Sequence, residues 1–449
     1  MKLQKFKEEL FKRGQKEGFT NMELYQNESR SFDLRVFDQE IDHYSINEDE
    51  GYSFRGKKDG KIGYAYTEKL DKAAIDMLLD KASQNANILE KKEGEIFSGS
   101  DQYKDVEYYK EDLNEIQPEE KISLIKSLEK EALDYDQRVD SVNYCLYSDL
   151  EFENKIINSK GLDLAFKNNI AYIYLSVIVK ENDDVRTASK YHITQDFSDF
   201  DIKETAHEAV DEAVSLLGAK SLKSGKYPVI LRHNVAADLL STYSSTLSAE
   251  RVQKGLSLFA DKLGEKVAAD ELSIIDDPFL KEGFNSSPFD GEGVATRKKE
   301  VIKDGTLTTY LHNLKTAKKA GVESTGNAYR GSHKSSVDIA PTNMYIEPGD
   351  NSYQSMISSI DEGVIIVEVQ GMHAGANTVS GDFSLSAFGY YIKDGKIERP
   401  VEQITVSGNY LDMLKDITLI GDDFQMRLPG AGHFGSPSLK IKSLEIAGE

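Results

Sequence analysis

Three Asp-Gly turns between strand-like runs restrict the fold of this chain more than any other feature of its sequence. They read Lys58-Asp59-Gly60-Lys61, Lys303-Asp304-Gly305-Thr306 and Lys393-Asp394-Gly395-Lys396. Asp-Gly is a favoured pair for the two-residue turn of a β-hairpin, because both central positions need a positive φ. The sequence therefore predicts antiparallel hairpins at three widely separated places.

The first half of the sequence shows the same order of elements twice. Each unit, about residues 1–90 and 118–218, is predicted to contain a helix, several antiparallel strands and a second helix. An acidic and polar segment, residues 91–117, is predicted to link the two units. We therefore expect an α+β fold. An N-terminal α+β domain of two similar units, residues 1–218, would be followed by a strand-rich C-terminal domain, residues 226–449.

Composition argues against several classes of function. The formal net charge of -22 and the pI near 4.9 oppose contact with nucleic acid, because the phosphate backbone would be repelled. The single cysteine, Cys145, leaves no intramolecular disulfide, which is typical of a reducing compartment. No run approaches the roughly 20 apolar residues that span a bilayer, and the first residues lack a signal-peptide pattern. We expect a cytoplasmic protein without nucleic-acid or membrane partners.

The stretch from Gly371 to Asn409 is rich in glycine and small polar residues, whereas a protein core is rich in branched apolar residues. Its glycines permit turns and close approaches, and Asn377, Ser380, Asp382 and Ser384 add hydrogen-bonding groups beside them. Such a surface suits the binding of an extended peptide through its main chain. Tight turns between strands explain the same composition equally simply.

Several short blocks stand in a fixed order in the second half of the sequence. They are Asp276-Asp277-Pro278, Phe289-Asp290-Gly291-Glu292-Gly293-Val294, Ser324-Thr325-Gly326-Asn327-Ala328 with Arg330, Gly381-Asp382-Phe383-Ser384, the hairpin Ile392-Lys393-Asp394-Gly395-Lys396, Pro400-Val401 and Ser407-Gly408-Asn409. In order and spacing these blocks resemble the TldD/PmbA family, which is also called modulator of DNA gyrase. The resemblance covers nearly the whole chain, and the blocks together are more specific than any one alone.

The resemblance separates two kinds of family member by their metal ligands. TldD-like members are zinc proteases with a His-Glu-x-x-x-His helix and a C-terminal cysteine ligand. Here the corresponding helix is expected over Asn234 to Arg251, with Ser241 and Thr246 at the two histidine positions and Ala431 near the cysteine position. Neutral hydroxyls are poor zinc ligands, and Thr242, at the glutamate position, is no general base at neutral pH. The chain therefore resembles the PmbA kind, also called TldE, which lacks the zinc motif, and we expect no metal or catalytic residue in it.

Other residues of the sequence are weaker candidates for metal ligands. His207-Glu208-Ala209-Val210-Asp211 resembles the start of a zinc helix, but the apolar stripe of that helix leaves these polar groups at its margin. His373 and His433 lie in glycine-rich loops, each alone in sequence. Acidic pairs could hold a hard cation such as calcium, although acidic turns explain them as well: Asp276-Asp277 and Asp290 with Glu292.

The resemblance implies a role without catalysis by this chain. Such a subunit would assemble with a zinc-bearing TldD-like partner into a dimer that encloses unfolded peptides or peptide precursors for proteolysis. The alternatives are a self-sufficient homodimer that binds peptides without cleaving them, and an enzyme with an unrecognised metal site. Candidate residues facing peptide or chamber are Glu250, Asn377, Gly381, Asp382, Phe383 and Ser384, with the tyrosines Tyr243, Tyr310, Tyr390 and Tyr391 as further possible wall residues.

Overall fold

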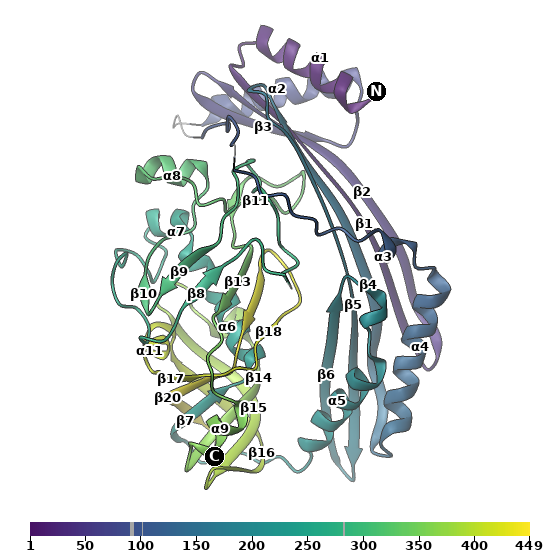
Figure 1. Ribbon diagram of the computed structural model, residues 1–449, viewed down its shortest axis with the longest axis vertical. Coiled ribbons are helices and arrows are strands. Elements are labelled where there is room, and N and C mark those ends of the chain that lie inside the picture. Colours follow the sequence, from purple (N-terminus) through teal and green to yellow (C-terminus); the bar gives the residue numbers. More distant parts are fainter. Residues whose placement is uncertain (90–93, 101, 282) are drawn as a thin grey trace.

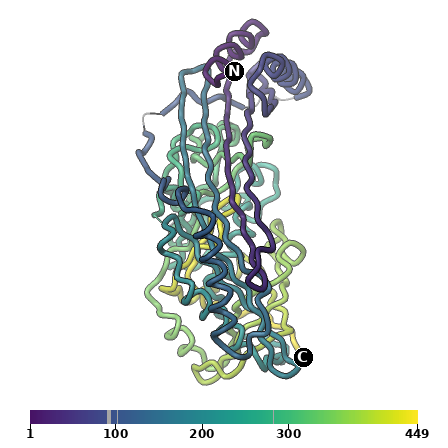
Figure 2. The backbone as a smooth tube through the Cα atoms, turned by 90° about the vertical axis from the view of Figure 1, so that its right-hand side faces the viewer, coloured from purple at the N-terminus to yellow at the C-terminus, as the bar shows by residue number. Residues whose placement is uncertain are grey.

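The protein consists of a long curved sheet that arches beside a second, strand-rich domain (Figure 1). This computed structural model describes residues 1–89, 94–100, 102–281 and 283–449. Residues 91–93 and 101 of the predicted linker lie outside the described residues. The two ends of the chain lie at opposite ends of the molecule (Figure 2). The mixture of helices with antiparallel strands confirms the predicted α+β class.

The N-terminal half forms one six-stranded antiparallel sheet in the order β3-β2-β1-β4-β5-β6. Each unit contributes a helix, three strands and a helix in the same order, and the two units join where β1 pairs with β4. The strands are β1 (Asn21–Phe37), β2 (Glu40–Lys58), β3 (Lys61–Thr67), β4 (Val139–Asn158), β5 (Asp163–Glu181) and β6 (Asp184–Thr194). The helices are α1 (Leu3–Lys16), α2 (Lys72–Ile88), α3 (Glu111–Glu115), α4 (Pro118–Tyr135) and α5 (Ile202–Ser215), with a short 3₁₀ turn, η1 (Phe197–Asp199).

Two helix pairs cover different parts of this sheet. Helices α1 and α2 enclose a small core at one end, and α4 and α5 cover a larger core on β1, β4 and β5. Capping residues in the local sequence determine where two of these helices begin. Asp71 accepts a hydrogen bond from the Ala74 N–H at the start of α2, and Asp201 does the same for two N–H groups at the start of α5. Alternating apolar residues on β1 then face the helices.

The C-terminal domain combines a closed ring of strands with a second sheet. The order β16-β15-β14-β7-β20 closes because β16 also pairs with β20, and β17 adds to β20 outside the ring. These strands are β7 (Gly225–Leu231), β14 (Glu362–Gln370), β15 (Asp382–Lys393), β16 (Lys396–Asn409), β17 (Ile417–Ile420) and β20 (Leu439–Ala447). The second sheet has the order β10 (Thr306–Leu307), β9 (Lys299–Lys303), β8 (Ile274–Asp276), β13 (Asn343–Ile346), β19 (His433–Ser436) and β18 (Gln425–Met426).

Helix α6 (His233–Ser244) packs into the largest apolar core, between these two sheets. It follows β7 directly, so its first turn lies at the end of a buried strand. The remaining elements are short: η2 (Ser245–Leu247), α7 (Ala249–Gln253), α8 (Leu314–Ala320), α9 (Tyr353–Ser358), α10 (Met372–Gly375), α11 (Tyr410–Lys415), and the paired strands β11 (Ala328–Tyr329) and β12 (Asp338–Ile339).

All three predicted Asp-Gly hairpins are confirmed. The flanking residues pair across each turn, and the aspartates take φ values of 50°, 43° and 49° at Asp59, Asp304 and Asp394. The following glycines take φ values of 81°, 72° and 71°. Both central positions are left-handed, as the preferred two-residue hairpin turn requires.

A buried chain of alternating charges joins the long sheet to the C-terminal domain. Arg330 pairs with Glu23 on β1, Arg55 on β2 lies 3.5 Å from the same Glu23, and Arg55 also contacts Glu292 at 2.9 Å. Burial would raise the pKa of Glu23, but Arg330 and Arg55 hold it below its ordinary range. Each charged group in this buried series lies beside a group of opposite charge. These ion pairs therefore fix the two domains relative to each other.

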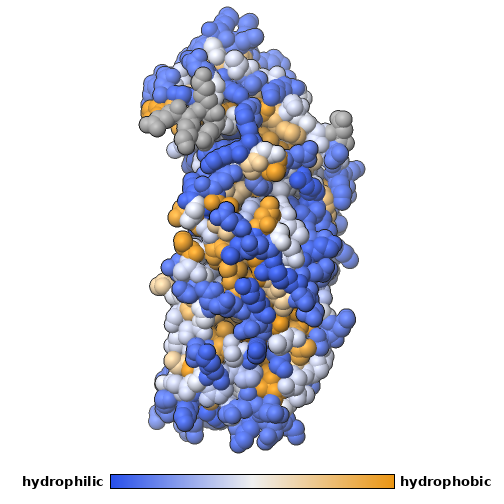
Figure 3. Space-filling view, turned by 90° about the vertical axis from the view of Figure 1, so that its left-hand side faces the viewer, coloured by the Kyte–Doolittle hydropathy of each residue, from blue (hydrophilic) through white to orange (hydrophobic). Residues whose placement is uncertain are grey.

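The molecular surface is hydrophilic over both ends of the face seen in Figure 3, with apolar residues scattered over its middle. Among the described residues, no helix combines the length and the apolar character needed to cross a membrane.

Candidate functional site

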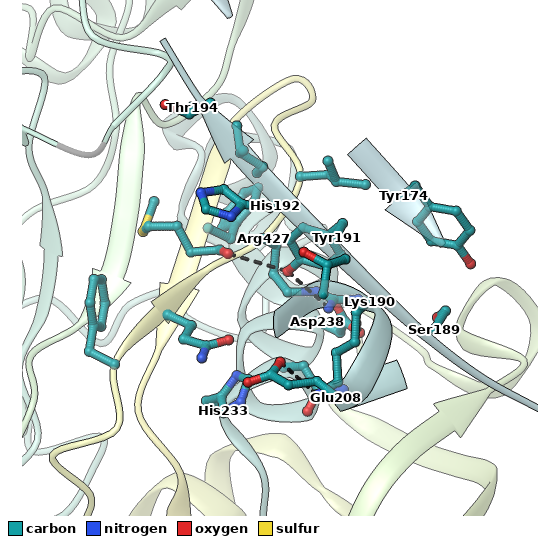
Figure 4. Close-up of a pocket in the computed structure, with 18 of the residues that line it drawn as sticks. Tyr174, Ser189, Lys190, Tyr191, His192, Thr194, Glu208, His233, Asp238 and Arg427 are labelled. Carbon is teal, nitrogen blue, oxygen red and sulfur yellow. Dashed lines mark hydrogen bonds and ion pairs between the residues drawn. The ribbon is translucent and has the colours of Figure 1, made fainter. Parts of the chain in front are cut away.

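A cleft of about 970 Å³ lies between the long sheet and the C-terminal domain. Strand β6 and helix α5 form one wall, and α6, β14 and β18 form the other. Figure 4 shows β6 crossing in front of α6, with β18 beside them. The volume is at the upper end of the range of ordinary ligand pockets, which is about 300–1,000 Å³.

Two strand edges open into this cleft. Strand β6 is the last strand of the N-terminal sheet, and β18 is the last strand of the second C-terminal sheet. Residues of both strands line the cleft, and within the described part of the chain no further strand pairs with either outer edge. A hydrogen bond links the two strands, since the Tyr191 hydroxyl donates to the Met426 carbonyl at 3.3 Å. An edge offers main-chain N–H and C=O groups to an added strand.

At the cleft wall, an ion pair fixes α6 to Arg427, the residue that follows β18. The Arg427 guanidinium donates to both carboxylate oxygens of Asp238, at 2.8 and 3.2 Å, and to the Tyr191 hydroxyl at 3.2 Å (Figure 4). Burial raises the pKa of Asp238, although Arg427 acts in the opposite direction. The bidentate geometry favours a rigid contact.

A second ionic cluster holds the first turn of α6 against α5 and β6. Arg232 donates to both carboxylate oxygens of Glu212, at 2.9 and 3.0 Å, and Lys190 lies 3.0 Å from the same carboxylate. Burial alone would raise the pKa of Glu212, but Arg232 and Lys190 hold it below its ordinary range. The cluster therefore joins the two domains at this end of the cleft.

Two polar side chains face the cleft without a hydrogen bond inside the described chain. Glu368 on β14 is half-buried, and burial raises the pKa of its carboxyl group. The buried Nδ1 atom of His233 has no partner, and burial together with Arg232 lowers the pKa of its imidazole to about 3. Both groups are therefore available to hydrogen-bond a bound molecule.

The positions expected for zinc ligands do not form a metal site. Ser241 lines the cleft, about 12 Å along the helix from His233 by the rise of an α-helix. Thr246 is fully buried and donates its hydroxyl to the Tyr243 carbonyl, and Ala431 lies exposed in the loop between β18 and β19. The side chains present therefore do not fit zinc. Searching the described residues, we find no group of three His, Cys, Asp or Glu side chains that could hold a metal ion.

The helix predicted from Asn234 to Arg251 is not continuous in the structure. Helix α6 ends at Ser244, a 3₁₀ turn follows, and α7 begins at Ala249. This break turns Thr246 into the protein interior, away from the cleft that Ser241 lines. Thr242 donates its hydroxyl to the Asp238 carbonyl at 2.8 Å.

The candidates in the glycine-rich stretch lie away from the cleft. Asp382 is exposed, and hydrogen bonds from Asn409 and Ser380 lower the pKa of its carboxyl group. Asn377 accepts hydrogen bonds from the main-chain N–H groups of Val379 and Ser380, as in an Asx turn. Ser384 is exposed on β15, and the Phe383 side chain is buried in the core.

Main-chain groups of this stretch, which is predicted to bind a peptide, form hydrogen bonds inside the protein. The Gly381 and Asp382 carbonyls both accept from the buried Tyr243 hydroxyl, at 3.1 and 3.0 Å, and Asp382 also accepts from the Asn377 N–H. Glu250, elsewhere, pairs with Lys254 at 3.1 Å. None of the six predicted candidates lines the cleft, so their role in peptide contact stays a prediction.

The acidic family blocks meet in the interior instead of forming an oxygen cage. Asp276 is fully buried and accepts from Lys299 at 2.7 Å, from Asn327 at 2.8 Å and from the Thr342 N–H at 2.7 Å. Asp290 accepts three main-chain N–H bonds, and burial raises its pKa to about 7. These carboxylates are satisfied by protein donors, which supports the interpretation as structural turns.

The isolated histidines also have structural surroundings. His207 stacks on Tyr135 with the ring centres 3.8 Å apart and contacts Glu131 at 2.9 Å, so it joins α5 to α4. His433 is fully buried between two main-chain partners, and His373 is exposed on α10.

Sequence reasoning missed Arg232, His233, Asp238, Glu368 and Arg427. The sequence does contain one signal for this site: the polar triplet Arg-His-Asn follows the apolar strand β7 directly. Polar residues between a buried strand and the start of a helix often lie at a site. Nothing local marked Arg427 as the partner of Asp238, because the two are 189 residues apart.

Two solved structures share this arrangement along the chain and define its structural class. A Thermotoga maritima protein whose name refers to modulation of a DNA gyrase is 35% identical, with a TM-score of 0.91 and coverage of 99% of this chain and 100% of its own. TldE from Thermococcus kodakarensis shares the fold with a TM-score of 0.90 at 24% identity, over 99% and 100% of the two chains. The class pairs a long antiparallel sheet with a closed ring of strands.

Family models then identify the particular family. PmbA/TldA metallopeptidase domain 1 matches residues 22–86, the central domain matches residues 111–217, and the C-terminal domain matches residues 224–448. The chain belongs to this metallopeptidase family, as the resemblance of its motifs predicted.

Curated relatives extend over most of the chain. An uncharacterized protein of Methanocaldococcus jannaschii is 31% identical over 447 residues, which is 97% of this chain and 98% of that protein. Metalloprotease PmbA of Escherichia coli O157:H7 is 29% identical over 336 residues, 75% of this chain and 71% of its own. A TldD homologue of Buchnera aphidicola is 28% identical over 438 residues, 90% and 88% of the two chains.

Proposed function

We propose that this chain is a non-catalytic, PmbA/TldE-like subunit that binds unfolded peptides for a zinc-bearing, TldD-like partner. The peptide would lie extended in the cleft and add a strand to the outer edge of β6 or β18. The observation that carries the proposal is the opening of these two strand edges into one cleft. Main-chain pairing suits unfolded substrates because it does not depend on particular side chains.

The donor set of α6 supports the non-catalytic part of the proposal. A zinc peptidase needs about three His, Cys or carboxylate ligands and an open position for water. Here Ser241 and Thr246 occupy the histidine positions and Ala431 the cysteine position, and Thr246 faces the interior. Neutral hydroxyls and a methyl group do not hold zinc, so hydrolysis is assigned to the partner.

The polar groups of the cleft would then position the peptide. Glu368 can accept an N–H from the bound chain when ionised, and the His233 ring can hydrogen-bond through Nδ1. The ion pairs of Arg427 with Asp238 and of Arg232 with Glu212 hold the two walls in place.

The alternative is a self-sufficient homodimer that binds peptides without protease activity. The same cleft supports it, since strand addition needs no metal. The two functions differ in what a TldD-like partner adds: cleavage of the bound peptide in the first, and nothing in the second.

The test is a variant that fills the cleft. Ser241→Trp places an indole on the cleft wall, and Ser127→Trp on the exposed face of α4 is the matched control. Binding of a fluorescein-labelled, reduced and alkylated casein fragment is measured by fluorescence anisotropy. We expect Ser241→Trp to weaken binding at least tenfold with an unchanged melting temperature, and Ser127→Trp to bind normally. Equal binding by both variants would refute the cleft as the peptide site.

A further inference from the structure

The opposite edge of the long sheet is also unpaired over a long stretch. Strand β2 pairs with β1 along its whole length, but β3 covers only its second part, from Tyr52 to Lys58. In the part of the chain that the structure describes, no strand pairs with the outer edge of residues 40–51. Between Glu40 and Glu50, Ser45 is partly buried and the other residues are exposed. Such an edge is a template for another strand.

An apolar strip runs along the same stretch. Ile41, Tyr44 and Ile46 are 45%, 44% and 45% exposed. They pair across the sheet with Val36, Leu34 and Phe32, which are buried in the core beneath α4. Figure 2 shows the β1–β2 hairpin running uncovered beside that helix. The strip therefore extends the sheet face that α4 covers as far as the edge of the sheet.

The edge is strongly acidic. Five of its eleven residues are carboxylates, and it contains no lysine or arginine: Glu40, Asp42, Glu48, Asp49 and Glu50. Arg35 and Arg30 on β1 contact Asp42 and Glu48, the latter at 3.7 Å, but the remaining charge is negative. In a pairing with a second copy, no register can place a lysine or arginine opposite an acid, because residues 40–50 contain neither. About Ser45 as the centre, Glu40 would face Glu50 and Asp42 would face Glu48. Like charges directly opposite each other destabilise a strand pair.

We propose that residues 40–50 of β2 dock an edge strand of a different polypeptide, one that carries lysine or arginine opposite these carboxylates and apolar residues above the strip. The acidic edge selects against a second copy of this chain, while the strip supplies apolar area to bury. The proposal concerns the sheet edge remote from β6, so it does not depend on what binds in the cleft.

The first experiment uses two synthetic peptides on the full-length protein. One carries the sequence of residues 40–50, and the other carries the same sequence with all five acids replaced by lysine. Fluorescence anisotropy at low salt should give at least tenfold tighter binding of the lysine peptide, weakening as salt is raised. Hydrogen exchange should show slower exchange of the amides of residues 40–50 when that peptide is bound.

Backbone methylation separates strand pairing from simple charge attraction. N-methyl groups on one alternate set of peptide amides should abolish binding, and on the other set should leave it intact, because alternate N–H groups face the docked strand. Equal binding by both methylated peptides would overturn strand docking. If the lysine peptide does not bind, the acids serve only to prevent strand pairing at this edge, and the proposal is overturned.

A cysteine at the centre of the edge tests the exclusion of a second copy. Ser45→Cys should remain uncrosslinked under oxidation, whereas Ser45→Cys with Glu48→Lys and Glu50→Lys should form a disulfide-linked dimer, because lysines then face Asp42 and Glu40. The natural Cys145 is fully buried and does not interfere. Crosslinking of the single Ser45→Cys variant as readily as the triple variant would make this edge a homodimer interface and refute the proposal.

Discussion

His433 should make the protein lose stability as the pH falls from about 6.5 to about 4. Its ring is fully buried, and its two nitrogens are committed to opposite roles. Nδ1 accepts from the Phe284 N–H at 3.1 Å, and Nε2 lies 2.6 Å from the Arg427 carbonyl, to which it donates. This arrangement requires the neutral ring. A second proton on Nδ1 would meet the Phe284 N–H, which is itself a donor.

The magnitude follows from the displaced titration. Burial lowers the pKa of His433 from 6.5 to about 4, although the bond to Arg427 acts in the opposite direction. The unfolded chain therefore binds the proton first, and the stabilisation is complete above 6.5 and lost as the pH falls through 4. One pKa unit corresponds to about 1.4 kcal/mol, so the whole effect is about 3 kcal/mol, most of it between pH 7 and 4.5.

The assay compares wild type with His433→Gln by urea unfolding, followed by far-UV circular dichroism at pH 7 and pH 4.5. The amide keeps a donor and an acceptor but does not titrate. The stability difference between wild type and variant should therefore change by about 2.5 kcal/mol between the two pH values. His43→Gln, at an exposed position on β2, controls for the loss of a titratable side chain. Titration of the His433 ring near pH 6.5 by NMR with labelled histidine would refute the reasoning.

Three further predictions concern stability. Arg330→Ala leaves the carboxylate of Glu23 buried with only the more distant Arg55, so urea unfolding should show a loss of about 3–5 kcal/mol, and Glu23→Gln combined with Arg330→Met should recover part of it. Gly389→Ala places a methyl group 1.9 Å from the Ile365 carbonyl oxygen, so the melting temperature should fall sharply or soluble expression should fail; normal stability would contradict this packing. Tyr243→Phe removes the hydroxyl that donates to the Gly381 and Asp382 carbonyls, so the free energy of unfolding should fall by about 1–3 kcal/mol in the same urea assay.

The hairpins could be predicted from sequence because their signal is local. An Asp-Gly pair needs only its own left-handed conformation and two flanking strands, and all three examples formed. By contrast, the strand-like runs at residues 22–26 and 32–37 predict two separate strands, yet both belong to the single strand β1. The polar residues between them carry no apolar alternation, because their neighbours are polar residues such as Asn154 on β4.

The end of α6 could not be predicted from apolar periodicity. Serine and threonine side chains in this segment bond to nearby carbonyls, Ser244 to Ser241 and Thr246 to Tyr243. Such local bonds compete with helical ones and favour the 3₁₀ turn that follows Ser244. A hydroxyl-rich run is therefore a signal for a helix end that the apolar stripe alone conceals.

The cleft depends on tertiary structure, so no local pattern indicates it. Strands β6 and β18 are more than 200 residues apart, and each becomes an edge only through the order of its sheet. Glycine and polar composition indicated Asp382 and Asn377, whose hydrogen bonds are made to other groups of the same domain, such as Asn409 and the Val379 N–H. The family blocks identified the fold correctly because their buried contacts, such as Asp276 with Asn327, hold distant segments together.

Zinc content and peptidase activity of the purified chain, alone and mixed with a TldD-like protein from the same organism, test the central claim most directly. The account predicts substoichiometric zinc and no cleavage of alkylated casein by this chain alone, and cleavage by the mixture that exceeds the activity of the partner alone. Stoichiometric zinc with cleavage by this chain alone would contradict the assignment of Ser241, Thr246 and Ala431 as replacements of the metal ligands.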